Sequence, residues 1–136
     1  MPHSADVHAF PLRVRYAETD AAGLAHHGSY LPWFEAARVE WLRAHGIVYA
    51  ALEREGYHLA VVEAFVRYVA PARFDDALLI RTGLVDMRSG GAAFVYEVVP
   101  DAPPPRQGAR GQTRHICLFR GQVAKLPEAV RRLAGA

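Results

Sequence analysis

Cysteine, long hydrophobic runs and clustered positive charge are all scarce in this sequence. The one cysteine, Cys117, cannot form a disulfide within the chain, and no apolar run approaches the roughly 18 residues of a membrane-spanning helix. The opening segment MPHSADVHAF has neither the basic stretch nor the apolar core of a secretion signal. We therefore expect a soluble, cytoplasmic protein with no integral membrane segment.

Positive charge is spread along the chain, and the formal net charge is only +2. A nucleic-acid surface normally requires a clustered basic patch, so we expect no nucleic-acid partner. A small anionic ligand requires far less charge and remains compatible with this composition.

The composition is that of a globular protein, with 136 residues, of which 51% are hydrophobic and 22% charged. This length fits a single domain, and no internal repeat or linker divides residues 1–136. A chain of this size buries only about two thirds of its unfolded surface, which favours oligomerisation.

Hydrophobic periodicity predicts an α+β domain with one sheet and one long helix. The segment FPLRVRY, residues 10–16, alternates as a strand does. The segment YLPWFEAARVEWLRAHG has an apolar helical face that includes Leu31. Because Pro32 is tolerated only in a first turn, this helix begins near residues 27–30, and it ends at Gly46. Glu35 and Arg38, on neighbouring turns, predict a structural ion pair.

The second half of the chain predicts four strands rich in β-branched and aromatic residues, joined by short connections that favour antiparallel pairing. Their sequences are HLAVVEAFVRYVAPARF, ALLIRTGLVDMR, AAFVYEVVPD and RGQTRHICLFRG. Strands of this length can curl around a buried helix. The segment LPEAVRRLAG predicts a short terminal helix.

Asp20 is the main candidate for chemistry, in a glycine-containing loop between the first strand and the long helix. A carboxylate there can act as nucleophile or general base, although Asp at such positions also caps helices or closes Asx turns. The first amides of a helix lack internal partners and carry its positive dipole end. If Asp20 faces these amides, that of His27 or Gly28 can polarise a carbonyl, as acyl transfer requires. We expect nearby Glu18 to be solvated.

The adjacent histidines His26 and His27 do not predict a metal site. Neighbouring residues point in different directions, and no further His, Cys or acid lies at a standard ligand interval. His27 has two open interpretations: it orients a substrate or water, or it forms a hydrogen bond within the loop.

Two blocks of sequence are similar to a known family. Asp20, Gly23, His27 and Tyr30 precede the helix WFEAAR, and APARFDD follows at a long interval. Together with MRSGGAAFVYEV, these blocks resemble the hotdog-fold acyl-CoA thioesterases, specifically the 4-hydroxybenzoyl-CoA thioesterase family and its Tol-Pal-associated branch. The resemblance implies a five-stranded antiparallel sheet around one long central helix, with two chains joined edge to edge and active sites at their interface.

The resemblance also implies roles for individual residues. Asp20 would be the catalytic carboxylate, as nucleophile or general base, and the backbone amide of His27 would polarise the thioester carbonyl. Gly28 and Tyr30 would contact the substrate. The hydroxybenzoyl branch carries Tyr where this chain has His27, so a small or medium aliphatic acyl group is expected. Coenzyme A enters as part of the substrate, with no separate cofactor.

Three further residues are candidates for substrate binding. The resemblance places Arg88 and Ser89 close to the CoA nucleotide. Glu63 is a candidate auxiliary base, although regular alternation puts Val61, Glu63 and Phe65 together on a face that is not clearly polar. Two alternative functions remain open: a hotdog hydratase or dehydratase, and a non-catalytic acyl-CoA-binding protein. Homodimers are expected, and tetramers are compatible with the sequence.

Overall fold

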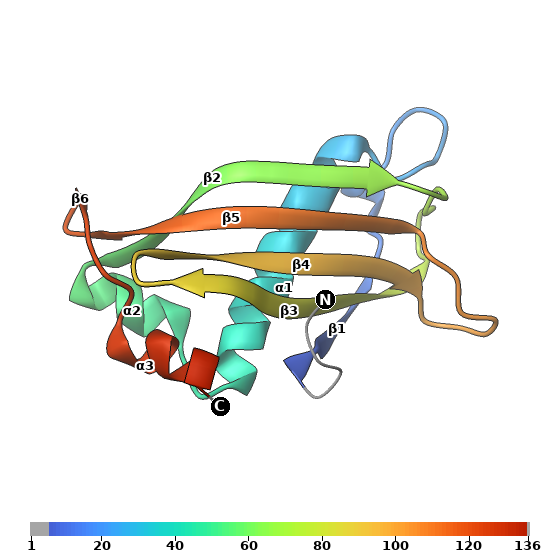
Figure 1. The fold of residues 1–136 in the computed structure, drawn as a ribbon. Helices are drawn as coiled ribbons and strands as arrows, with labels where there is room; N and C mark the ends of the chain where they lie inside the picture. Colours follow the sequence, from blue (N-terminus) through green and yellow to red (C-terminus); the bar gives the residue numbers. More distant parts are fainter. Residues whose placement is uncertain (1–5, 136) are drawn as a thin grey trace.

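A strongly curved antiparallel sheet wraps around one long helix in the computed structural model, which describes residues 6–135 (Figure 1). The helices are η2 (Tyr16–Glu18), η3 (His27–Ser29), α1 (Tyr30–Ala44), α2 (Tyr49–Glu55), α3 (Glu128–Arg131) and η4 (Arg132–Gly135). The strands are β1 (His8–Arg13), β2 (Tyr57–Tyr68), β3 (Ala77–Arg88), β4 (Gly91–Pro100), β5 (Ala109–Phe119) and β6 (Gln122–Val123). The predicted hotdog architecture is therefore confirmed.

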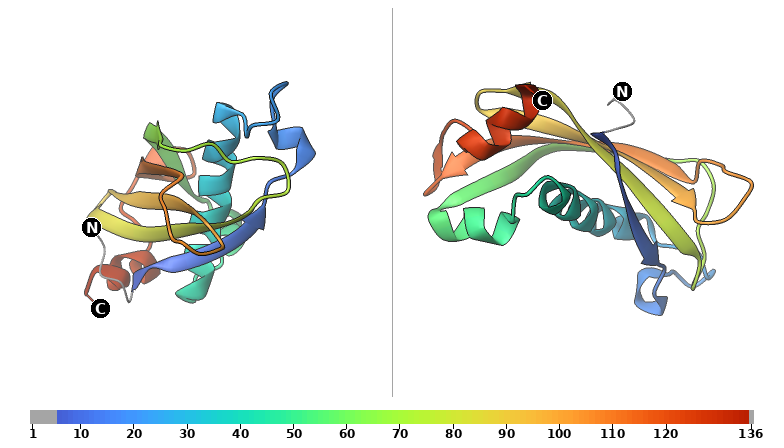
Figure 2. Two further views of the ribbon diagram at one scale, coloured as in Figure 1. Left: turned by 90° about the vertical axis from the view of Figure 1, so that its right-hand side faces the viewer. Right: turned by 90° about the horizontal axis from the view of Figure 1, so that it is seen from below.

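The five long strands lie in the order β1-β3-β4-β5-β2, and the short β6 pairs with β5. Figure 2 shows α1 and α2 on the concave side of the sheet, whereas α3 lies on the convex side. Strand β6 and helix α2 are absent from the sequence prediction. Both are short, so periodicity alone carries little signal for them.

Helix α1 fills the concave side because its apolar face is broad. Its buried residues are Tyr30, Trp33, Phe34, Ala37, Trp41 and Leu42. The predicted bounds are confirmed, with Pro32 in the first turn and Gly46 in a left-handed conformation, φ 82°, just after the helix. Leu31, predicted on the apolar face, is instead 42% exposed on the side of the helix.

The predicted first strand is displaced, since β1 spans His8–Arg13 and the chain turns at Tyr16. The turn is stabilised by Glu18, whose carboxylate accepts from the Arg15 amide at 2.7 Å. This capping interaction starts η2 and ends the extended conformation that alternation predicts. Tyr16 is consequently 77% exposed.

The alternation predicted for β2 is broken by a β-bulge. Val61 pairs with His115, but the next paired residue is Glu63, opposite Arg114. The extra residue, Val62, shifts the pattern, so Val61 does not share a face with Glu63 and Phe65 as regular alternation predicts. Glu63 and Phe65 lie on the convex face, away from α1.

A row of buried polar side chains, the buried polar row, lies between α1 and the sheet. The Thr113 hydroxyl lies 2.6 Å from the Tyr96 hydroxyl and 2.8 Å from His115 Nε2. Burial lowers the pKa of His115 from 6.5 to about 4, and the positive charge of Arg38 contributes. The predicted Glu35–Arg38 ion pair is wrong among the described residues, because Arg38 donates to the Tyr96 hydroxyl at 3.4 Å.

Candidate functional site

The loop of residues 19–29, called the Asp20 loop below, presents its carboxylate to solvent. Asp20 Oδ1 accepts from the amides of Ala22 at 2.9 Å and Leu24 at 3.1 Å. Gly23 supplies the positive φ, 79°, that the tight turn requires. Asp20 therefore closes an Asx turn, while within residues 6–135 its second carboxylate oxygen has no hydrogen-bond partner.

Glu18 anchors the inner side of the loop instead of being solvated as the sequence predicts. Its side chain is 13% exposed, and its Oε2 accepts from the Trp33 indole at 2.8 Å. Burial would raise the pKa of Glu18, but the Arg15 amide, the Trp33 indole and the Arg15 guanidinium together hold it below its ordinary value. Glu18 is thus a charged structural anchor between the loop and α1.

Contacts with two other segments fix the path of the Asp20 loop. Thr19 and Ala25 form an antiparallel bridge, and the Ala25 amide donates to the Ala72 carbonyl at 2.8 Å. Asp20 follows one end of this bridge by one residue, and His27 follows the other end by two. The bridge therefore holds Asp20 and the start of the helix near each other.

The helix start offers one open amide, that of His27. The amide of Gly28 donates to His26 Nδ1 at 3.0 Å, so it is already occupied. No partner accepts from the His27 amide in the part of the chain that the structure describes. The Tyr68 hydroxyl donates to the His27 carbonyl at 2.9 Å and fixes this peptide from the other side. An acceptor oxygen can reach the His27 amide without displacing a protein group.

Two of the other predicted site residues near the helix start differ in accessibility. Gly28 is exposed, whereas Tyr30 is only 3% exposed and packs against the rings of Trp33 and Tyr68. Tyr30 also lines a cavity of about 530 Å³ between the β2–β3 connection and the β4–β5 loop. The structure thus brings four predicted residues to one end of the molecule.

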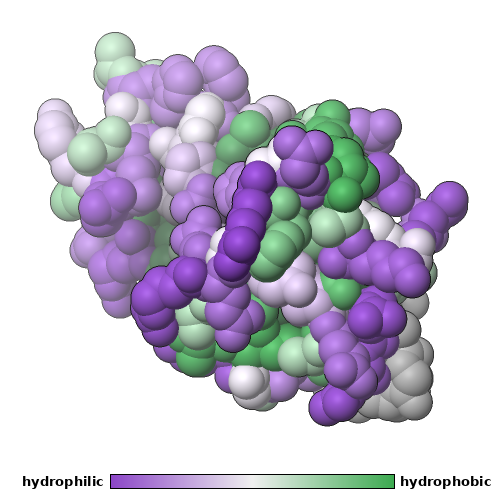
Figure 3. All heavy atoms as spheres, turned by 90° about the vertical axis from the view of Figure 1, so that its left-hand side faces the viewer, coloured by the Kyte–Doolittle hydropathy of each residue, from purple (hydrophilic) through white to green (hydrophobic). Residues whose placement is uncertain are grey.

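The remaining predicted residues lie elsewhere. Arg88 and Ser89 form the β3–β4 turn, at the opposite end of the molecule from the Asp20 loop (Figure 1). At that end, Figure 3 shows polar residues over much of the surface with apolar residues gathered between them. Arg88 is 74% exposed and lies 3.4 Å from Asp86, and Glu63 is exposed on β2. One chain alone therefore does not unite all the predicted residues.

Sequence reasoning missed Tyr68 and the anchoring role of Glu18. Tyr68 reaches His27 across 41 residues of sequence, and Glu18 reaches Trp33 across 15. Alternation offers no signal for such contacts, because they depend on how β2 and α1 pack. The nearby YVAPARFDD segment was the available pointer to Tyr68.

The described residues contain no group of three or more His, Cys, Asp or Glu side chains arranged to hold a metal ion. Among the same residues, no helix is both long and apolar enough to cross a membrane.

Comparison with known proteins identifies the family. Residues 14–133 match the model of the Thioesterase-like superfamily. The acyl-CoA thioester hydrolase YbgC of Escherichia coli O6:H1 is 41% identical over 66% of this chain and 67% of its own length. A putative esterase of Aquifex aeolicus is 30% identical over 87% of this chain and 90% of its own.

Solved structures agree with the sequence comparison. The hypothetical protein TT1821 from Thermus thermophilus superposes with a TM-score of 0.88 at 36% identity, over 93% of this chain and 97% of its own. Fold, sequence and the position of the Asp20 loop point the same way. The chain belongs to the Thioesterase-like superfamily of hotdog-fold proteins and is a thioester hydrolase.

Proposed function

We propose that this protein hydrolyses the thioester of a small or medium acyl-CoA to the free acid and CoA. The observation that carries the proposal is the pairing of an exposed Asp20 carboxylate with the open amide of His27. The E. coli relative is named an acyl-CoA thioester hydrolase, which supports the same substrate class.

The chemistry requires two groups on opposite sides of a thioester carbonyl. Asp20 attacks the carbonyl carbon to form a mixed anhydride, or it removes a proton from an attacking water. Either route builds negative charge on the carbonyl oxygen, which the His27 amide and the helix dipole stabilise. The C–S bond then breaks, and CoA leaves as the thiolate. In this proposal the backbone of His27 matters more than its imidazole.

Other parts of the proposal concern the substrate and its surroundings. A small or medium aliphatic acyl group fits the presence of His27 in place of the tyrosine found in the hydroxybenzoyl branch. Arg88 and Ser89 bind the CoA nucleotide, and no separate cofactor is required. The protein acts in the cytoplasm as a homodimer with joined sheet edges, or as a tetramer of such dimers.

A panel of acyl-CoA substrates tests the proposal, with release of free CoA thiol as the readout. We expect turnover of aliphatic acyl-CoA with little turnover of aromatic acyl-CoA. A change in enoyl absorbance without thiol release would instead indicate a hydratase or dehydratase. Tight CoA binding with no turnover across the panel would indicate a binding protein, and either outcome rejects the proposal.

A further inference from the structure

The two open edges of the sheet are built differently. Strand β1 has six residues and contains Pro11, which cannot donate to a neighbouring strand. Strand β2 has twelve residues and no proline. Its apolar side chains are exposed: Val61 at 47%, Val62 at 48% and Phe65 at 56%. A long apolar edge of this kind is unfavourable in a free monomer and indicates a pairing partner.

The backbone groups at the open edge of β2 can be assigned from the alternation of antiparallel hydrogen bonds. The Cys117 amide donates to the Gly90 carbonyl at 2.8 Å, toward β4, so odd-numbered residues of β5 bond β4 and even-numbered residues bond β2. The β2 residues opposite Arg110, Gln112 and Arg114 therefore bond β5. Ala64 and Val66, between them, direct their amides and carbonyls outward to the open edge.

Charge on the convex face of β2 is arranged symmetrically around one residue. Glu63, Phe65 and Arg67 share that face at two-residue intervals. Arg67 stands directly opposite Arg110 on β5, an unfavourable like-charge pair, and no carboxylate among the described residues lies within 4 Å of either guanidinium. Arg67 therefore lacks an anionic neighbour in the single chain.

We propose that two copies of this chain pair β2 with β2 in antiparallel fashion, about a two-fold axis at Phe65. In this register Glu63 lies opposite Arg67 of the partner subunit, and Arg67 lies opposite the partner's Glu63. Ala64 and Val66 of the partner subunit form reciprocal backbone hydrogen bonds. The inference rests on the edge-to-edge homodimer of the proposed function and specifies its contacts.

Neighbouring registers are less favourable. A shift of the axis to Ala64 sets Glu63 against the partner's Phe65, and a shift to Val66 sets Arg67 against the partner's Phe65. An axis between two residues would oppose outward-directed backbone groups to groups already bonded to β5. Only the axis at Phe65 satisfies both the hydrogen bonds and the charges.

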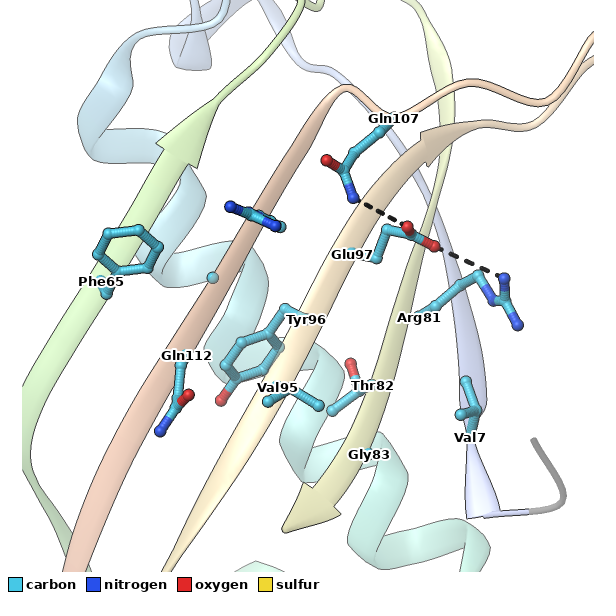
Figure 4. A pocket seen from close by; sticks show the side chains of 12 residues that line it. Val7, Phe65, Arg81, Thr82, Gly83, Val95, Tyr96, Glu97, Gln107 and Gln112 are labelled. Carbon is cyan, nitrogen blue, oxygen red and sulfur yellow. Dashed lines mark hydrogen bonds and ion pairs between the residues drawn. The ribbon is translucent and has the colours of Figure 1, made fainter. Parts of the chain in front are cut away.

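The pairing also continues a groove on the convex face. A groove of about 420 Å³ runs across β3, β4, β5 and β2, and Phe65, Gln112 and Val95 lie along it in front of the sheet (Figure 4). Phe65 ends the groove at the open edge. In the proposed dimer Phe65 of the partner subunit lies beside it, so the two grooves join and both exposed rings gain apolar contact.

The same register completes the candidate site. Antiparallel pairing sets the Tyr68 end of β2 beside the Tyr57 end of the partner's β2. The β3–β4 turn lies at that second end, so Arg88 and Ser89 of the partner subunit come to the same end of the dimer as the Asp20 loop. Residues that one chain separates are thus united by two.

Cysteine substitution reads the register directly. Only a residue on the two-fold axis meets its own copy, and a pair without mutual hydrogen bonds has the Cα spacing of a disulfide. Under mild oxidation we expect Phe65→Cys to form covalent dimers, whereas the matched variants Ala64→Cys and Val66→Cys do not. Wild type, with only buried Cys117, is the control. Dimers from either neighbouring variant instead of Phe65→Cys would overturn the register.

Charge reversal tests the ion pairs independently. Glu63→Arg and Arg67→Glu each create two like-charge contacts, so each should raise the dimer dissociation constant at least about tenfold in sedimentation experiments. Mixing the two variants restores both contacts in the heterodimer, which should return the constant to within about threefold of wild type. Failure of the mixture to recover, or a monomeric wild type, would overturn the inference. Wild-type acyl-CoA hydrolysis, measured separately, shows whether the proposed function fails with it.

Discussion

The Asp20 loop and the buried polar row are both rich in polar groups near α1, yet they differ in what they leave open. In the buried polar row, Thr113 bonds both neighbours and His115 is 1% exposed. In the loop, Asp20 is exposed and the His27 amide is open. The row contains the most strongly shifted histidine, but no substrate can reach it. Access, more than a shifted pKa, therefore distinguishes a candidate site from a structural network in this protein.

The largest expected effect on stability lies in the buried polar row. The pKa of folded His115 is about 4, below its ordinary 6.5, so the unfolded chain binds more protons between these values. Its contribution is complete above pH 6.5 and is lost as the pH falls toward 4, by about 3 kcal/mol in total. Urea unfolding across this range should show the loss, and His115→Gln should abolish it. An unchanged pH slope in the variant would contradict the assignment.

A smaller loss of stability is expected at the inner side of the Asp20 loop. Glu18→Ala leaves the buried Trp33 indole without its acceptor, which should cost about 2 kcal/mol. Because the folded pKa of Glu18 is lowered, its contribution is present above the ordinary 4.5 and is lost as the pH falls through the folded value. Thermal unfolding at pH 7 and pH 3 checks both points. Exposed Glu55→Ala is the matched control and should change neither.

Tyr68→Phe should affect catalysis more than stability. The variant loses the hydrogen bond to the His27 carbonyl and loosens the peptide that precedes Gly28. We expect kcat to fall about threefold to tenfold, the equivalent of one hydrogen bond. Steady-state kinetics with an acyl-CoA substrate measures this, and a wild-type kcat would remove Tyr68 from the site.

The smallest effect is expected at the β3–β4 turn. Arg88→Ala removes an exposed positive charge from the proposed nucleotide contact, so KM for acyl-CoA should rise about threefold while kcat stays constant. Arg132→Ala, another exposed arginine with an ion-pair partner, is the control. A matching KM change with a short N-acetylcysteamine thioester, which lacks the nucleotide, would argue against this role.

Much of the fold could be predicted because its long elements are strongly periodic. The predicted strand at residues 77–88 coincides with β3, and the helix bounds follow from Pro32 and Gly46. The bulge at Val62 could not be predicted, since it depends on how β2 pairs with β5. The turn at Tyr16 was missed because the Glu18 cap outweighs local alternation.

The candidate site was predicted only in part. Asp20 and His27 stand in a local motif, so the sequence alone brings them together. The occupied amide of Gly28 depends on the rotamer of His26, which no pattern reports. The distance between Arg88 and the Asp20 loop depends on the length of the curved sheet, and a second chain is needed to bridge it.

The most direct test compares kcat/KM for one good acyl-CoA substrate between Asp20→Asn and His115→Gln at pH 7. Asparagine keeps the oxygen that accepts from the Ala22 and Leu24 amides, so the loop should stay folded while the carboxylate is lost. We predict a loss of about 10²- to 10⁴-fold for Asp20→Asn and less than about threefold for His115→Gln. A fully active Asp20→Asn, or an inactive but folded His115→Gln, would contradict the assignment of the chemistry to the Asp20 loop.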